Sequence, residues 1–130
     1  MSSVQPLFAP VRMGDLDLPN RIVMAALTRM RAGPIDHVPT TLQAEYYAQR
    51  ASAGLLVAEA TAISADGFGY ADAPGLWSAD QGRGWRRVTD AVHAASGRII
   101  AQLCHTGAIA HTDMCGGYTD YPPFRLAAAE

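Results

Sequence analysis

The 130-residue chain has few cysteines, little charge and no long apolar run. Its two cysteines, Cys104 and Cys115, are too few for the disulfide framework that stabilises small secreted domains. A net charge of −2 gives no basic field that would attract nucleic acid or an anionic membrane surface. The apolar runs fall far short of the ~20 residues that a membrane helix needs. Because the first residues lack a secretion pattern, we expect a cytoplasmic protein without nucleic-acid or membrane partners.

Several catalytic motifs are also missing from the sequence. It has no GxxxxGK[ST] phosphate loop, and no GxGxxG joins a predicted strand to a helix. No GxSxG nucleophile elbow of a serine hydrolase occurs either. What remains is an ordinary globular composition, with 49% hydrophobic and 17% charged residues, at a length that allows one domain.

Hydrophobic patterning predicts a hairpin followed by parallel strands. Residues 11–13 and 16–18 alternate in polarity around Gly14-Asp15, which is typical of a short β-hairpin. Residues 22–26 form a continuous run of small apolar side chains, as expected of a strand buried on both faces. Residues 55–58 and 98–103 have the same character and are predicted to be the second and third strands.

A helix is expected after each of the first two of these strands. Thr40 and Gln43 have the spacing of a capping box, and Gly54 stands where a C-terminal cap is expected. The apolar face of this first helix is predicted to consist of Leu42, Tyr46 and Ala53. Ser78 and Gln81 form a second capping box, which opens a helix reaching about residue 95. Its buried stripe is predicted to consist of Trp85, Val88 and Val92.

Alternating strands and helices predict a right-handed parallel α/β fold. Such a series is either a small open sheet or the beginning of a closed (β/α)8 barrel, which takes ~250 residues. This chain is long enough for about half of such a barrel at most. Since a three-stranded sheet has unpaired edges, we expect association with another chain or another copy.

Polar and small residues follow the predicted strands, at the edge where parallel α/β folds bind ligands. Thr28 and Gln102 offer hydrogen-bond donors and acceptors, while Ala25 and Ala60 leave room for a flat ring. Thr28 could equally serve only to end a strand. Gln102 lies inside an apolar strand, where a buried amide without partners costs about 1–3 kcal/mol. It should therefore be hydrogen-bonded within the protein or contact a ligand. Tyr70 is either an ordinary loop aromatic or a lid over that ligand.

The sequence also contains residues of the types that bind metals. Four potential zinc ligands, Cys104, His105, His111 and Cys115, lie within twelve residues. However, Cys104 and His105 are adjacent at the end of a predicted strand, so their side chains should point to opposite faces. Because there is also no CxxC pair, a packed cysteine and loop histidines are favoured, and no metal is expected.

Five short motifs occur in a fixed order, at residues 18–21 (LPNR), 24–29 (MAALTR), 45–54 (EYYAQRASAG), 59–61 (EAT) and 102–107 (QLCHTG). Together they resemble the amino-terminal segment of the Old Yellow Enzyme family over residues 7 to about 111. Members of this family are flavin-dependent ene-reductases built on a (β/α)8 TIM barrel. The resemblance implies an α/β fold forming a partial barrel, with the hairpin at the barrel floor and about three parallel βα units, completed by association.

The resemblance implies FMN as cofactor and NAD(P)H as reductant. Thr28 would hydrogen-bond the flavin near its O4/N5 edge, and Ala60 would place a backbone group against the same ring. Gln102 would contact the pyrimidine side, while Ala25 and Ala26 would line the flavin face through their backbone. The family reaction is a hydride transfer from nicotinamide to flavin and then to an activated alkene, such as an enone or a nitro compound.

The residues on the substrate side of the site match the family pattern only in part. Tyr70 and Cys104 would line the substrate pocket, although the family usually has tryptophan where Cys104 stands. It also usually has proline at Ala26 and arginine at Ala108. The family's proton donor and its pair of substrate-binding residues lie further along the chain than any motif matched here. The catalytic residues are therefore unknown.

The end of the chain resembles a different part of the family. Residues 116–122 (GGYTDYP) resemble the family's carboxyl-terminal tail, which suggests an internal deletion, and residues 125–130 resemble a vector-derived sequence. We therefore expect residues 1–111 to be the amino-terminal part of an FMN-binding barrel and residues 112–130 to be a tail.

Two functions follow from these expectations. The first is an FMN-dependent oxidoreductase of Old Yellow Enzyme type, present as an incomplete chain. It would act on a small molecule and would be completed by a homo-oligomer or by a complementary barrel-fragment chain. The alternative is a non-catalytic fragment or binding module with vestigial flavin residues. Bound flavin would distinguish the two.

Overall fold

The computed structural model describes residues 5–107, 110, 111 and 113. After a 3₁₀ turn at Pro6–Phe8, strands β1 (Val11–Met13) and β2 (Leu16–Leu18) pair in antiparallel fashion. Gly14, in the connecting turn, has a φ of 59°, a left-handed conformation that glycine adopts without steric cost. The predicted hairpin is confirmed. Apart from residue 113, the predicted tail at 112–130 lies outside the described residues.

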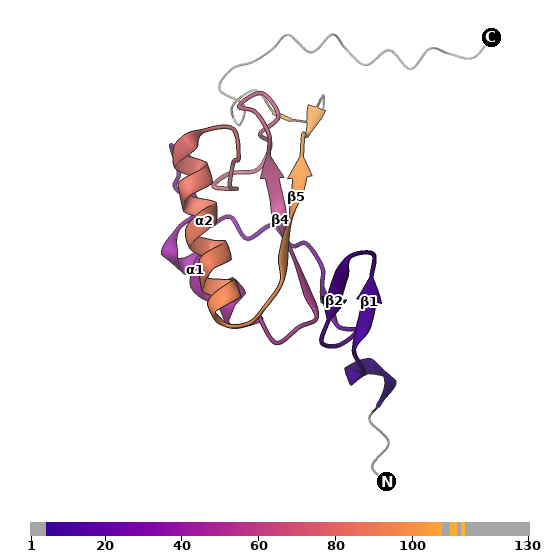
Figure 1. Cartoon of the computed structure of the whole chain (residues 1–130). Coiled ribbons are helices and arrows are strands. Elements are labelled where there is room, and N and C mark those ends of the chain that lie inside the picture. The colour runs from indigo at the N-terminus through magenta and orange to yellow at the C-terminus, as the bar shows by residue number, and fades with distance from the viewer. Residues whose placement is uncertain (1–4, 108–109, 112, 114–130) are drawn as a thin grey trace, which may run out of the picture.

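A three-stranded parallel sheet forms the centre of the molecule. Its strands are β3 (Val23–Met24), β4 (Leu55–Ala62) and β5 (Ile99–Cys104), in the order β3-β4-β5. Helices α1 (Thr41–Ala48) and α2 (Ala79–Ala94) connect these strands and lie on the same side of the sheet (Figure 1). The predicted parallel α/β series is therefore confirmed.

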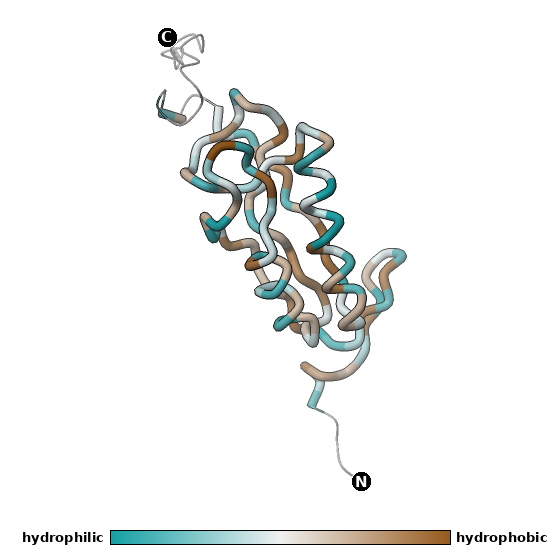
Figure 2. Tube along the Cα trace, turned by 90° about the vertical axis from the view of Figure 1, so that its left-hand side faces the viewer, coloured by the Kyte–Doolittle hydropathy of each residue, from teal (hydrophilic) through white to brown (hydrophobic). Residues whose placement is uncertain are grey.

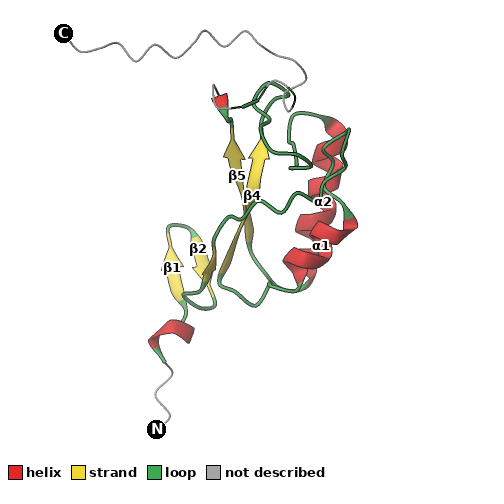
Figure 3. Ribbon diagram, turned by 180° about the vertical axis from the view of Figure 1, so that it is seen from behind, coloured by secondary structure: helices red, strands yellow, loops and turns green. Residues whose placement is uncertain are grey.

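The two ends of the sheet differ. The hairpin lies beside the amino ends of β4 and β5, whereas the loop at residues 63–78 and the chain after β5 lie at their carboxyl ends (Figure 3). Ala62 N–H donates to Pro74 O at 3.0 Å, and Leu76 N–H donates to Ala62 O at 2.8 Å, so this loop is anchored to the end of β4. The carboxyl end, where the sequence predicts the ligand, is thus partly built by the loop.

The main apolar core lies between the two helices and β4. Figure 2 shows brown, apolar stretches of chain in the middle of the molecule beside the largely teal α2. The largest side chains of this core are Tyr47, Leu56, Trp85, Val88 and Val92. The predicted buried stripe of α2 is confirmed, and burial of this apolar surface provides most of the driving force for folding.

Both predicted capping boxes are present. Thr40 N–H donates to Gln43 Oε1 at 2.9 Å, and α1 begins at the next residue. Ser78 N–H donates to Gln81 Oε1 at 3.0 Å, while Ser78 Oγ accepts from Gln81 N–H at 3.2 Å. These bonds satisfy donors at the first turn that have no partner within the helix.

The predicted apolar face of α1 is correct only in part, since Tyr46 and Ala53 pack partly buried against the core but Leu42 does not. Leu42 is 55% exposed, and the buried side chains of the helix are Gln43, Ala44 and Tyr47. The helix also ends at Ala48, so Gly54 is not its cap. Gly54 instead lies directly against the backbone carbonyl of Asn20, where a Cβ atom would collide.

The predicted bounds and burial of two strands also need correction. In the first strand only Val23–Met24 is paired, and Ile22, Val23 and Leu27 are exposed. They are not buried on both faces because both helices lie on one side of the sheet and β3 is an outer strand whose only described neighbour is β4. Conversely, β4 continues through Ala62, so the Glu-Ala-Thr motif lies within the strand and not after it. Among the described residues, no helix has the length and apolar character needed to cross a membrane.

Candidate functional site

Ala60 and Gln102, two of the predicted flavin residues, are direct partners in the pairing of β4 with β5. Since partners in a parallel sheet project from the same face, a methyl group and an amide lie side by side there. The register of the two strands shifts between Val57 and Ala60, so this pair follows an irregularity in β4. Such irregularities re-aim side chains and are common beside binding sites.

The expectation that Gln102 is a buried amide is wrong. Gln102 is exposed, as are Ile100 and Leu103. Both helices lie on one side of the sheet, so no described layer covers its other face, and β5 is an outer strand whose only described partner is β4. The penalty for an unpaired buried amide therefore does not apply in this chain, and the Gln102 side chain can reach a ligand.

Ala25, Ala26 and Thr28 lie in the segment that follows β3. Ala25 is exposed, while Ala26 and Thr28 are half-buried. Within the described residues, neither the Thr28 hydroxyl nor the Gln102 amide takes part in a hydrogen bond. Both groups keep their full capacity to donate and accept.

The structure brings Ala60, Tyr70 and Cys104 together. All three line a cavity of about 10 Å³ beneath the loop that follows β4. Thr106 fixes this loop, since its N–H and its hydroxyl donate to Gly67 O at 3.0 and 2.9 Å. A space of this size holds about one water molecule. Tyr70 and Cys104 are therefore neighbours of the Ala60 site, with the loop packed closely over it.

Sequence reasoning missed Glu59, which is a fully buried carboxylate in the middle of β4. Its Oε1 accepts from Gln43 Nε2 at 2.9 Å and from the Tyr47 hydroxyl at 3.2 Å, and its Oε2 accepts from Arg29 N–H at 2.9 Å. The available signal was an acidic residue within an apolar strand, because carboxylates are almost never fully buried unless they are paired.

Tyr47 completes this network. Its hydroxyl donates to the Glu59 carboxylate and accepts from Glu59 N–H at 2.8 Å. Burial, together with the neighbouring carboxylate, raises the pKa of Tyr47 far above its ordinary value of 10.0. The hydroxyl therefore stays protonated and remains a donor to Glu59 across the physiological range of pH.

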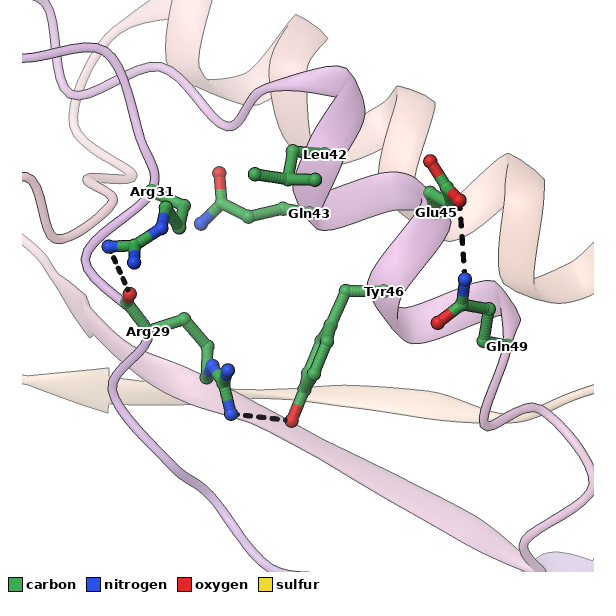
Figure 4. A pocket seen from close by; sticks show the side chains of 7 residues that line it. All are labelled: Arg29, Arg31, Leu42, Gln43, Glu45, Tyr46 and Gln49. Carbon is green, nitrogen blue, oxygen red and sulfur yellow. Dashed lines mark hydrogen bonds between the residues drawn. The ribbon is translucent and has the colours of Figure 1, made fainter.

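A separate pocket of about 180 Å³ lies between the segment after β3 and helix α1 (Figure 4). Arg29 Nη1 donates to the Tyr46 hydroxyl at 3.0 Å, and the Arg29 guanidinium lies 4.4 Å from the centre of the Tyr46 ring. The full lining is Arg29, Arg31, Leu42, Gln43, Glu45, Tyr46 and Gln49. None of the predicted flavin or substrate residues lines this pocket.

Two of the potential metal ligands lie at this end of the sheet, Cys104 as the last residue of β5 and His105 directly after it. Among the described residues, no three histidine, cysteine or acidic side chains gather into a metal site. His105 Nε2 lies 3.8 Å from an Asp66 carboxylate oxygen, and Cys104 is half-buried. Cys115, the fourth predicted ligand, lies outside the described residues.

Comparison with known proteins identifies relatives of the whole segment. Residues 6–120 match the NADH:flavin oxidoreductase / NADH oxidase family. The flavin oxidoreductase hxnT of Emericella nidulans is 45% identical over 127 residues, which are 95% of this chain and 33% of that protein.

Solved structures agree with this match. The Old Yellow Enzyme homologue from Zymomonas mobilis (NCR) superposes with a TM-score of 0.83 at 53% identity, over 86% of this chain and 31% of that one. Morphinone reductase in complex with tetrahydroNAD gives a TM-score of 0.78 at 51% identity, over 83% and 29%.

These matches fix the family and the kind of fold. The chain spans about a third of the length of the relatives that it matches. Its structural neighbours are TIM-barrel Old Yellow Enzymes, so the parallel sheet corresponds to part of a (β/α)8 barrel. For this family the comparisons confirm the expected cofactor, FMN, and the expected reductant, NAD(P)H. The chain belongs to the NADH:flavin oxidoreductase / NADH oxidase family, to which the Old Yellow Enzymes belong.

Proposed function

We propose that this chain supplies the flavin-binding side of an FMN-dependent ene-reductase that uses NAD(P)H to reduce activated alkenes such as enones and nitro compounds. The observation that carries the proposal is the direct pairing of Ala60 with Gln102 on neighbouring parallel strands. Parallel α/β folds bind their ligands beyond the carboxyl ends of such strands, and both residues lie in the carboxyl-terminal halves of theirs.

The residues at this edge fit a flavin. A flat ring needs small side chains beneath it, which Ala25, Ala26 and Ala60 provide. Its pyrimidine edge carries both donors and acceptors, which calls for side chains with mixed capacity. Thr28 and Gln102 have that capacity, and among the described residues neither uses it for a hydrogen bond within the protein.

In the proposed enzyme, the bound cofactor and the side chains have separate roles. Bound FMN supplies the hydride chemistry that connects the nicotinamide to the alkene. Thr28 and Gln102 bind and orient the ring through hydrogen bonds, and the alanines allow its close approach to the backbone. Tyr70 and Cys104, beside Ala60, form one wall of the substrate pocket and restrict the access of water. We assign no proton donor to any residue of this chain.

A second part of the proposal concerns assembly. Both outer strands of the sheet, β3 and β5, have a single described neighbour, and each bears exposed apolar side chains. Unpaired strand edges of this kind pair readily with other chains. We therefore propose that a second copy or a complementary barrel-fragment chain covers them when the flavin site is complete.

The first experiment is size-exclusion chromatography of the purified chain, with absorbance read at protein and flavin wavelengths, followed by titration with FMN. Flavin that elutes together with the protein supports the proposal and makes a screen of alkenes with NAD(P)H worthwhile. A protein peak without flavin absorbance, after incubation with saturating FMN, overturns the proposal and favours the non-catalytic binding module.

Replacing Gln102 by alanine tests the role of this one side chain in the site. We expect FMN binding to weaken by about 1–3 kcal/mol, because one polar contact to the ring is lost and its partner is left unsatisfied. Gln49→Ala is the matched control, since Gln49 is also an exposed glutamine but lies after helix α1. Equal affinities for the Gln102→Ala variant and the control would remove Gln102 from the site.

A further inference from the structure

We infer that Glu59 is a positioning residue for the flavin edge of the site, because its buried carboxylate holds the Thr28 segment at a fixed place beside Ala60. The inference rests on the proposed function for the roles of Thr28 and Ala60. Its geometric part concerns only the contact between Glu59 and the segment after β3, and that part can be tested without flavin.

One side chain connects the two segments. Glu59 Oε2 accepts a hydrogen bond from Arg29 N–H at 2.9 Å, across thirty positions of sequence. Arg29 directly follows Thr28, and Glu59 directly precedes Ala60. This carboxylate therefore ties the main chain next to Thr28 to the strand residue next to Ala60.

The Thr28 segment has few other anchors. Strand pairing ends at Met24, and the next backbone N–H that donates to a backbone carbonyl elsewhere in the chain is Ala32 N–H, which bonds to Asp72 O at 2.9 Å. Between these two points the bond to Glu59 is the only hydrogen bond from a described backbone N–H to the rest of the protein. The Arg29 side chain also donates to the Tyr46 hydroxyl at 3.0 Å, so loss of the Glu59 bond removes the backbone anchor beside Thr28 and leaves this side-chain contact at Arg29.

The carboxylate is itself held firmly. Gln43 Nε2 and the Tyr47 hydroxyl both donate to Oε1, which leaves Oε2 aimed at Arg29. Among the described residues no cation forms an ion pair with Glu59, so neutral donors alone compensate its buried charge. Burying a carboxylate is costly. An apolar residue would fill this position at lower cost, but it could not accept the Arg29 N–H.

The variant that tests this inference is Glu59→Gln. Glutamine keeps the volume of the side chain but replaces one acceptor oxygen by an NH2 group, so the three donors around it can no longer all be accepted. Val92→Ala is the matched control, since Val92 is fully buried in the apolar core on α2 and is not among the residues that bond to the Glu59 carboxylate. Tyr47→Phe is a second variant, because it removes the bond to Oε1 and the acceptor of Glu59 N–H but leaves the bond from Arg29 N–H to Oε2 in place.

Two quantities are measured in each variant by NMR and by fluorescence titration. The first is the exchange rate of the Arg29 amide hydrogen without FMN, compared with the core amides of β4. The second is the dissociation constant for FMN. We expect Glu59→Gln to speed Arg29 exchange at least about tenfold relative to the β4 amides and to weaken FMN binding by a similar factor, since a hydrogen bond to a charged group is lost. Tyr47→Phe should change both in the same direction, but less.

The outcomes separate the inference from the proposed function. Val92→Ala should lower the melting temperature without changing the relative exchange of Arg29 or the affinity for FMN. If Arg29 exchange is unchanged in Glu59→Gln, or rises equally in Val92→Ala, the positioning role is wrong. If Arg29 exchange rises while the affinity for FMN stays at the wild-type value, the role in flavin binding is wrong. A wild-type protein that binds no FMN would overturn the proposed function, yet the exchange data would still report on the contact with Glu59.

Discussion

At the scale of single residues, His37 shows how a loop side chain makes stability depend on pH. Its ring lies 3.9 Å from the centre of the Phe68 ring, and its Nδ1 is buried with no hydrogen-bond partner among the described residues. This burial lowers the pKa of His37 below 6.5, against the opposing influence of Asp36 and Asp72. The folded protein therefore holds His37 neutral at a pH where the unfolded chain has already protonated it.

The linkage between protonation and folding sets the direction in which stability changes with pH. A depressed histidine pKa contributes stability that is complete above about pH 6.5 and is lost as the pH falls from there through the folded-state pKa. We expect His37→Asn to flatten this acid-side decline of the melting temperature, because asparagine does not titrate and tolerates the left-handed φ of 55°. Thermal melts between pH 8 and pH 4 would check it, with exposed His93→Gln as control. An unchanged acid slope in His37→Asn would exclude His37 as its source.

At the scale of elements, α2 contains two glycines in opposite environments. A Cβ atom at Gly82 would meet nothing within 4 Å, whereas one at Gly84 would lie 2.8 Å from side-chain atoms of both Val38 and Pro39. Gly82→Ala should therefore stabilise the protein by about 0.5–1 kcal/mol, through a smaller loss of backbone entropy on folding. Gly84→Ala should destabilise it, because the helix must move away from Pro39. Urea denaturation of both variants measures the difference, and a gain in Gly84→Ala would show that this contact yields easily.

The two helices also show what the sequence could predict about elements. Helix α2 was predicted closely, since a capping box and a regular apolar stripe, including Trp85 and Val92, agree with each other. The buried face of α1 was only partly correct because hydrophobic spacing favours Leu42 over Gln43. Gln43 is buried since its amide supplies a donor to Glu59 on β4. Local periodicity contains no information about such a partner, which lies sixteen residues further along the chain.

At the scale of the whole molecule, the topology was predictable, whereas the burial of the outer strands was not. Parallel strands place their carboxyl ends at one edge, so the convergence of Ala60 and Gln102 followed from strand order alone. The burial of Gln102 and of β3 depended on neighbours on the outer sides of the sheet, which no local pattern specifies. The described sheet has no such neighbour, and Leu103 on β5 is consequently 62% exposed.

This exposure leads to a prediction about assembly. If a second chain covers the outer edge of β5, a lysine at Leu103 should oppose it, because charged side chains on edge strands disfavour pairing between edges. We expect Leu103→Lys to shift sedimentation-velocity profiles toward the monomer and to lower FMN binding wherever assembly completes the site. Ile35→Lys is the matched control, since Ile35 is 91% exposed but lies in a loop far from β5 in the sequence. A shift of equal size in both variants would mean that general surface hydrophobicity drives association and that the edge of β5 does not. A wild-type chain that sediments as a monomer at every concentration would mean that the open strand edges are stable in water without a second copy.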